Sequence, residues 1–175
     1  GFEKAGFERE YRKEYYDNNR WSFAPASSPV SLENEAGAVS AETLDMSGCY
    51  PITKTVLRYN SEDGLYYRSI YGTAQCDAVT GEQLSFSNVL IENAVSGSRG
   101  GGYLYYHVLD EGHDGYYLTG GKMIHVRWSK TSDYGTTRFY KDNGEEITLN
   151  TGMTMVFVTR EGLDHFTADG VRYDL

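Results

Sequence analysis

Turn signals recur about every ten residues along most of this chain, from position 52 to the carboxy terminus. Examples are Asp63-Gly64 and Gly120-Gly121, where glycine supplies the backbone freedom that a tight turn needs. Short runs rich in β-branched and aromatic residues stand between the turns. This spacing is typical of an all-β sandwich or barrel. No repeat of roughly 20 to 50 residues is present, so a solenoid or a propeller is not indicated.

The run KMIHVRWS, residues 122–129, alternates in the way that assigns side chains to the two faces of a strand. One face carries Ile124, Val126 and Trp128, and the other carries Met123, His125 and Arg127. Because the first set is wholly apolar, we expect Trp128 to lie in the core.

These patterns predict a mainly β fold, an antiparallel β-sandwich or a barrel-like meander of hairpins, with a short N-terminal helix. The helix is expected near the start, where Phe7, Tyr11 and Tyr15 recur every four residues. Residues 22–41 are rich in Ser, Ala, Pro and Glu without a sustained period, which indicates a linker or an extended crossing segment. We therefore divide the chain into two parts. Residues 1–41 form an N-terminal helix and linker, which in one interpretation are the tail of a missing preceding domain. Residues 42–175 form a β-rich domain.

The charge of the chain limits its partners. It has 25 acidic against 16 basic residues, a net charge of -9, and the basic residues are scattered. Such a chain repels phosphate backbones, so we expect no nucleic acid partner. No window approaches the ~20 consecutive apolar residues of a membrane helix, so no membrane insertion by this chain is expected. Because the chain starts at Gly1, an export signal or a lipid anchor upstream would not be visible.

The chain has two cysteines, Cys49 and Cys76. If residues 61–64 close the first hairpin, residues 60 and 65 face each other, and the same register places the two cysteines opposite one another. This arrangement predicts a disulfide, on condition that the chain lies in an oxidising compartment. Two buried free thiols are the alternative.

Motifs of known chemistry are missing. The histidines are His107, His113, His125 and His165. None has a metal-ligand spacing, since HExxH and CxxC are absent, so we expect no metal and no cofactor. Neither a G-x-S-x-G elbow nor a P-loop is present, and the run SGSRGGG (96–102) indicates a flexible connection. The sequence predicts no catalytic residue.

Tyrosine is the unusual residue, with 16 copies. Five lie close together: Tyr103, Tyr105, Tyr106, Tyr116 and Tyr117. Strand alternation places some of them on the non-core face, where a rigid ring with a polar tip suits recognition; the alternative is that both faces are buried. We therefore predict a non-catalytic binding module. Its predicted binding residues are Tyr103, Tyr105, Tyr116, His125, Arg127 and Arg138.

A hydrolase is the alternative hypothesis. His125 and Arg127 share one strand face and could act with an acid such as Asp133 or Asp110. A half-exposed histidine within a strand is more often a structural hydrogen-bonding group, so the binding hypothesis is preferred. The loop TSDYG, residues 131–135, stays open as a functional loop.

Three motifs, in this order, resemble the YerB-like family of bacterial lipoproteins, which carry a two-part domain of unknown function (DUF3048). The first, CDAVTGEQLSFSNV, matches at Asp77, Gly81, Leu84, Asn88 and Val89. The second, LTGGKMIHVRWSK, matches at Trp128 and Lys130. The third, ITLNTGMT, matches at Leu149, Asn150, Gly152 and Thr154. The chain departs from the family at Met155, where a Trp is usual, and after Gly162, where its tail is longer.

The resemblance covers residues 44 to about 160, the carboxy-terminal part of such a protein. It implies an extracytoplasmic protein, lipid-anchored to the cell membrane in its full-length form and typical of Gram-positive bacteria. It brings no catalytic residue. Together with the tyrosines, it leads us to expect a binding or scaffolding module for an envelope polysaccharide or a protein partner, with a cell-envelope hydrolase as the alternative.

Overall fold

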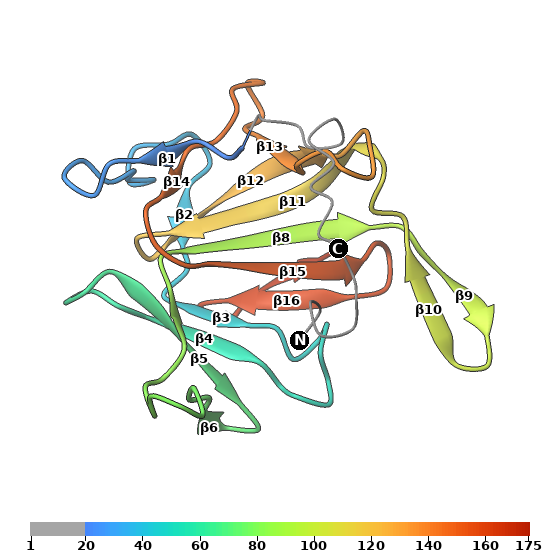
Figure 1. Ribbon diagram of the computed structural model, residues 1–175, viewed down its shortest axis with the longest axis horizontal. Helices are drawn as coiled ribbons and strands as arrows, with labels where there is room; N and C mark the ends of the chain where they lie inside the picture. Colours follow the sequence, from blue (N-terminus) through green and yellow to red (C-terminus); the bar gives the residue numbers. More distant parts are fainter. Residues whose placement is uncertain (1–19) are drawn as a thin grey trace, which may run out of the picture.

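The computed structural model describes residues 20–175, which form strands joined by turns (Figure 1). The mainly β prediction is confirmed. The helix predicted from Phe7, Tyr11 and Tyr15 falls outside the described residues. Within residues 20–175 no helix is long and apolar enough to cross a membrane.

Two sheets form the body of the fold. The first has the order β13-β12-β11-β8-β15, with β2 also pairing with β12. Its strands are β2 (Val39–Ser40), β8 (Asn88–Ala94), β11 (Glu111–Thr119), β12 (Lys122–Ser129), β13 (Arg138–Tyr140) and β15 (Thr154–Arg160). These strands pair antiparallel except β15, which runs parallel to β8.

The second sheet has the order β17-β16-β3-β4-β5-β6, with β7 also pairing with β5. Its strands are β3 (Thr43–Asp45), β4 (Val56–Asn60), β5 (Leu65–Ile70), β6 (Thr73–Ala74), β7 (Ser85–Phe86), β16 (His165–Ala168) and β17 (Val171–Asp174). Among the described strands, neither order returns to its own start, so the barrel-like alternative is wrong: both sheets stay open.

The main core is shared by the two sheets. The second sheet contributes Leu44, Leu57, Tyr66 and Phe166, and the first contributes Val89, Ile91, Leu118, Met123 and Phe157. These side chains are almost completely removed from water, and burial of large apolar groups is the dominant favourable term in folding. The sheets are therefore held together by one apolar interface.

A second core lies on the other face of the first sheet. It contains Ile124, Val126 and Trp128, so the predicted division of strand β12 into two faces is confirmed. Trp128 is fully buried, and its Nε1 donates to the backbone oxygen of Asn93 at 3.0 Å. The polar handle of this large ring is thus satisfied inside the core.

Residues 20–41 cover this second core as an extended crossing segment. Leu32 inserts into the core, and Trp21 Nε1 donates to the backbone oxygen of Thr137 at 2.7 Å. Strand β1 (Phe23–Ala24) also pairs in parallel with β14 (Leu149–Asn150). The segment is packed on the sheet, so it is not a free linker.

The motif residues Asn88 and Asn150 form a hydrogen-bond network at the edge of this core. Asn88 Nδ2 donates to the backbone oxygen of Asn150, and Asn88 Oδ1 accepts from the backbone nitrogen of Asn150 at 2.8 Å. The Asn150 side chain in turn bonds both backbone groups of Val30 and the Thr119 hydroxyl. Two widely separated motifs therefore meet at one place and fix the crossing segment.

The predicted disulfide is not formed. Cys49 is a buried free thiol that donates to the backbone oxygen of His165 at 3.2 Å, and Cys76 is an exposed free thiol. The expected hairpin register holds between β4 and β5 as far as Val56 and Ser69. Beyond it the chain turns back into β6 and carries Cys76 away from Cys49.

Candidate functional site

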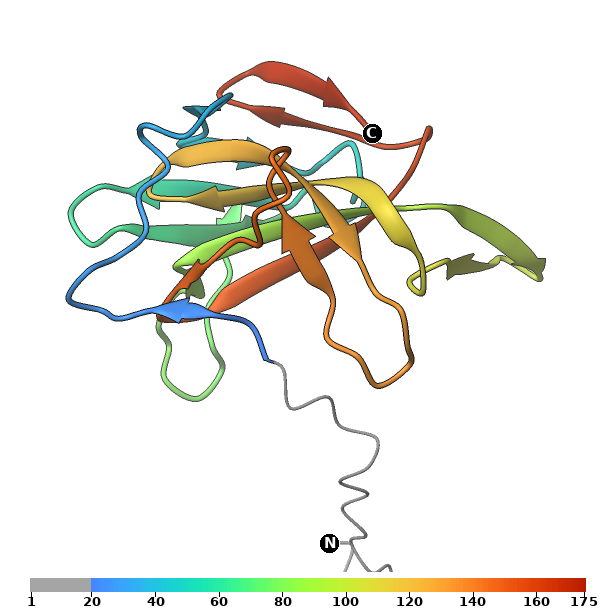
Figure 2. The same ribbon diagram turned by 90° about the horizontal axis from the view of Figure 1, so that it is seen from above.

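A two-stranded ribbon projects from the end of the first sheet (Figures 1 and 2). It consists of β9 (Ser96–Gly100) and β10 (Tyr103–Tyr106), which pair antiparallel with each other and with no other described strand. The interpretation of SGSRGGG as a flexible connection is wrong, because its first five residues are strand β9. Glycines 100–102 form the tip with positive φ values of 83, 63 and 84°, a conformation that favours glycine.

The ribbon exposes large apolar side chains. Tyr103 is 74% exposed and Leu104 53% exposed, and Tyr106 also reaches solvent. The residues that follow the ribbon, Val108 and Leu109, are exposed as well. Several large apolar side chains exposed together on one projecting element mark an interaction site more often than a scattered single residue does.

One face of the ribbon carries a stack of three side chains centred on Tyr105. The Arg99 guanidinium lies 5.7 Å from the Tyr105 ring centroid, and the His107 ring meets the tyrosine edge-on at 5.2 Å. Gly97 lies opposite Tyr105, and a Cβ at Gly97 would come within 2.5 Å of the ring. The glycine therefore lets the ring lie flat across the ribbon.

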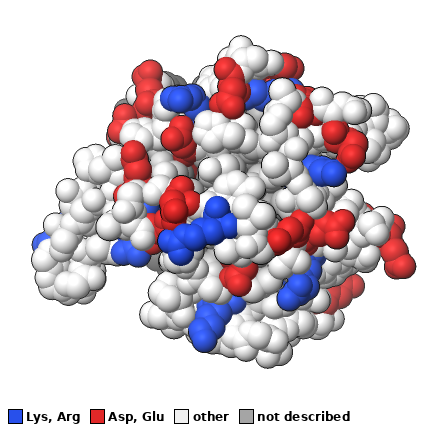
Figure 3. All heavy atoms as spheres, turned by 180° about the vertical axis from the view of Figure 1, so that it is seen from behind, with Lys and Arg blue, Asp and Glu red and all other residues white. Residues whose placement is uncertain are grey.

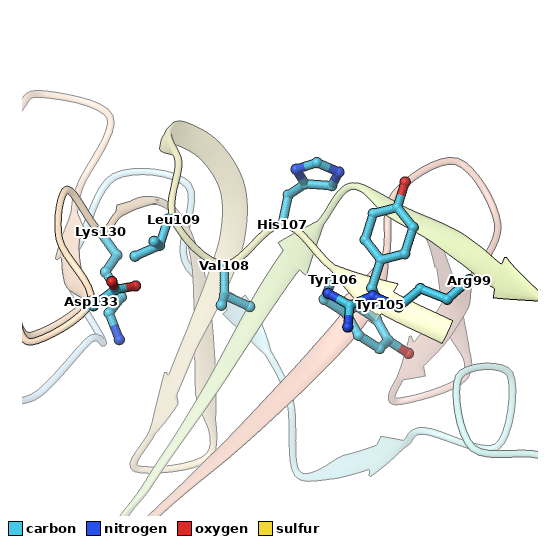
Figure 4. A pocket seen from close by; sticks show the side chains of 8 residues that line it. All are labelled: Arg99, Tyr105, Tyr106, His107, Val108, Leu109, Lys130 and Asp133. Carbon is cyan, nitrogen blue, oxygen red and sulfur yellow. The ribbon is translucent and has the colours of Figure 1, made fainter. Parts of the chain in front are cut away.

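A groove of about 540 Å³ runs along the base of the ribbon. It is lined by Arg99, Tyr105, Tyr106, His107, Val108, Leu109, Lys130 and Asp133. Figure 4 shows the ribbon residues at one end, Lys130 and Asp133 at the other, and Val108 and Leu109 between them. Aliphatic side chains in the middle and polar groups at both ends are a common composition for a binding site.

A buried carboxylate lies behind Lys130. Glu92, in strand β8, is only 7% exposed although its side chain is ionisable. Burial raises the pKa of its carboxyl group, and the Lys130 charge and a hydrogen bond with Thr137 act in the opposite direction. Glu92 was not among the predicted site residues, although a lone acidic residue within the apolar run NVLIENA is a visible signal.

The hydrolase residues form a different cluster. His125 Nδ1 lies 2.7 Å from Asp142 Oδ1, and His125 Nε2 lies 3.3 Å from Asp114 Oδ1. Arg127 is 3.8 Å from the same Asp114 carboxylate. Both ring nitrogens of His125 therefore face carboxylates, which leaves neither of them directed at a substrate.

The two acids named in the hydrolase hypothesis lie elsewhere. Asp110 pairs with His113 at 2.9 Å, and Asp133 lines the groove. The pKa of Asp110 is lowered first by the backbone N–H of Glu111 and then by His113. The carboxylates that contact His125 are those of Asp114 and Asp142, not those of Asp110 or Asp133.

The remaining predicted binding residues do not join the ribbon. Tyr116 is half-buried, with its ring edge against Phe166 and Tyr173. Its neighbour Tyr117, which is not one of the six predicted binding residues, is in the core. Arg138 pairs with Glu146 at 2.9 Å and donates to the backbone oxygen of Arg20, so it holds the crossing segment. Only Tyr103 and Tyr105 of the six lie on the ribbon.

In Figure 3, basic and acidic side chains are interspersed on the face seen from behind. Within residues 20–175 no group of three His, Cys, Asp or Glu side chains is placed to hold a metal ion.

Comparisons with known proteins agree with the sequence motifs. A family model described as "Protein of unknown function (DUF3048) C-terminal domain" matches residues 49–156. The crystal structure of YerB protein from Bacillus subtilis is similar in fold, with a TM-score of 0.61 and 20% identity over 81% of this chain. The match covers 44% of that protein, and no curated protein matches the chain. The family resemblance is confirmed: the chain belongs to the family of the DUF3048 C-terminal domain, a family of unknown function.

Proposed function

We propose that this chain is a non-catalytic binding or scaffolding module that acts outside the cytoplasm, carried by a protein that is lipid-anchored to the cell membrane. Its ligand is an envelope component, either a polysaccharide or a protein. The motifs of the YerB-like family support the location, because lipoproteins of this kind are held at the outer surface of the membrane. The ribbon and its groove support the binding role.

The exposed apolar ribbon is the observation that carries the proposal. Tyr103, Leu104 and Tyr106 leave apolar surface in water on an element that contributes nothing to either core. Burial of such surface against a ligand contributes roughly 25 cal/mol per Å², and tyrosine rings are frequent centres of binding energy.

Binding to isolated cell wall and to membrane-protein extracts tests the proposal. The chain with Tyr103, Leu104 and Tyr106 replaced by serine should lose binding to one of these two preparations, because its apolar contact surface is removed.

The matched control replaces Ile52, Tyr71 and Val79 by serine, since these residues are exposed on other parts of the fold. The control should bind as the unchanged chain does. Equal binding by the ribbon variant and the unchanged chain would refute the proposal.

A further inference from the structure

We infer that the groove-side edge of strand β10 accepts an extended, acidic segment of a partner protein as an additional β-strand. This inference rests on the proposed binding function and names the partner class. The segment would lie alongside β10, in the groove between this strand and residues 130–133. It would be recognised by backbone hydrogen bonds and by one charged contact.

The backbone of β10 offers unpaired groups along this edge. His107 N donates to Val95 O at 2.8 Å, and the ribbon pairs Tyr106 with Ser96, Tyr105 with Gly97 and Leu104 with Ser98. In an antiparallel pair, bonded and non-bonded positions alternate, so the N–H and C=O groups of Leu104 and Tyr106 point away from β9. No other described strand pairs with them.

This edge lacks some of the devices that usually protect a free strand, although β10 is only 4 residues long and its register with β9 shifts between Tyr103 and Leu104. Natural edge strands are blunted by lysine, proline or a covering element, and β10 has none of these among the described residues. Its residues Tyr103–Tyr106 are all aromatic or aliphatic. An edge without lysine, proline or a covering element, beside a groove, is an arrangement that strand addition can use.

Charge selects the kind of segment. Arg99 lines the groove and forms no ion pair within residues 20–175, where its recorded contact is the Tyr105 ring. Lys130 stands at the other end of the groove. Asp133 stands beside Lys130 at that end, so among the described lining residues Arg99 is the cation without a neighbouring carboxylate. In a chain with a net charge of -9, this cation favours a segment that carries a carboxylate opposite it.

Two blocked peptides of matched β propensity, VEVTVEV and VKVTVKV, probe the site with the full chain. NMR titration should show that VEVTVEV shifts the amide signals of residues 104–108, and that VKVTVKV binds about tenfold more weakly. VEVTVEV with N-methyl groups on alternate backbone nitrogens should not bind, because it cannot donate to β10. Absence of binding by VEVTVEV, or binding that survives N-methylation, would overturn the inference.

Leu104→Pro removes one outward N–H of β10 without touching the bonds between β9 and β10, so it should weaken VEVTVEV binding about tenfold. Ser98→Pro makes the corresponding backbone change on the far edge, of β9, and also removes the hydroxyl that accepts from Gly100 N at 3.1 Å; it should leave binding unchanged. Equal effects of the two prolines would contradict strand addition at β10. If VEVTVEV fails to bind while the serine variant of the ribbon loses envelope binding, this inference fails and the proposed function stands.

Discussion

Replacing Asn150 by alanine tests the role of the motif residues most directly. Its side chain accepts from Val30 N at 2.7 Å and donates to Val30 O at 3.1 Å and to Thr119 Oγ1 at 2.8 Å. A hydrogen bond contributes about 1 kcal/mol net, so the loss of three predicts about 3 kcal/mol. Val30 is half-buried and water can replace part of the loss, so we expect Asn150→Ala to destabilise the chain by about 2 to 3 kcal/mol.

Urea unfolding measures this cost, as a lower midpoint with an unchanged slope. Hydrogen exchange should also speed up at Leu32, because the crossing segment loses its fixed point. Asn143→Ala is the matched control: its Oδ1 accepts only from Glu145 N in an exposed turn, so it should cost less than about 1 kcal/mol. The reasoning would be refuted if Asn150→Ala cost no more than Asn143→Ala.

Three further predictions concern other parts of the fold. Burial raises the pKa of the Cys49 thiol to about 12 whereas Cys76 is exposed, so a thiol reagent should titrate one thiol in the folded chain and both after denaturation; two in the folded chain would contradict this. Burial raises the folded-state pKa of Glu92 above its ordinary value of 4.5, so its stabilising contribution is complete below that pH and is lost as pH rises through the raised pKa. As pH rises above about 4.5, the Glu92→Gln variant should therefore lose less stability than the unchanged chain, as measured by thermal unfolding. Equal losses in the two proteins would count against this prediction. Gly97→Val should displace the Tyr105 ring and so change the ring-current shift of the His107 signals in NMR spectra. Unchanged His107 signals would contradict this prediction.

Local alternation and turn residues predict the body of the fold well. The face of strand β12 that carries Trp128 and the register of the first hairpin both follow from it, because a strand exposes alternate residues to opposite faces. The disulfide prediction was wrong because the strand alternation ends before the chain reaches Cys76. Tyr71 and Gly72, at φ values of 54 and 75°, turn the chain into β6, and a tyrosine gives no sign of a left-handed turn.

The candidate site was predictable only in part. The tyrosines of β10 were identified, but Arg99 was hidden in a glycine-rich run that resembles a flexible loop. The run becomes strand β9 because β10 supplies its hydrogen-bond partners. Such pairing depends on residues outside the run itself. The groove also needs Lys130 and Asp133, which the fold alone brings near the ribbon.

Site-specific photo-crosslinking in cells that produce this protein tests the binding role of the ribbon most directly. A photoreactive amino acid at Leu104 should give a discrete crosslinked product with an envelope component. The same group at Val79, which is 94% exposed on a turn of the second sheet, should give none. No crosslinked product at Leu104, or the same product at Val79, would contradict the proposed binding role of the ribbon.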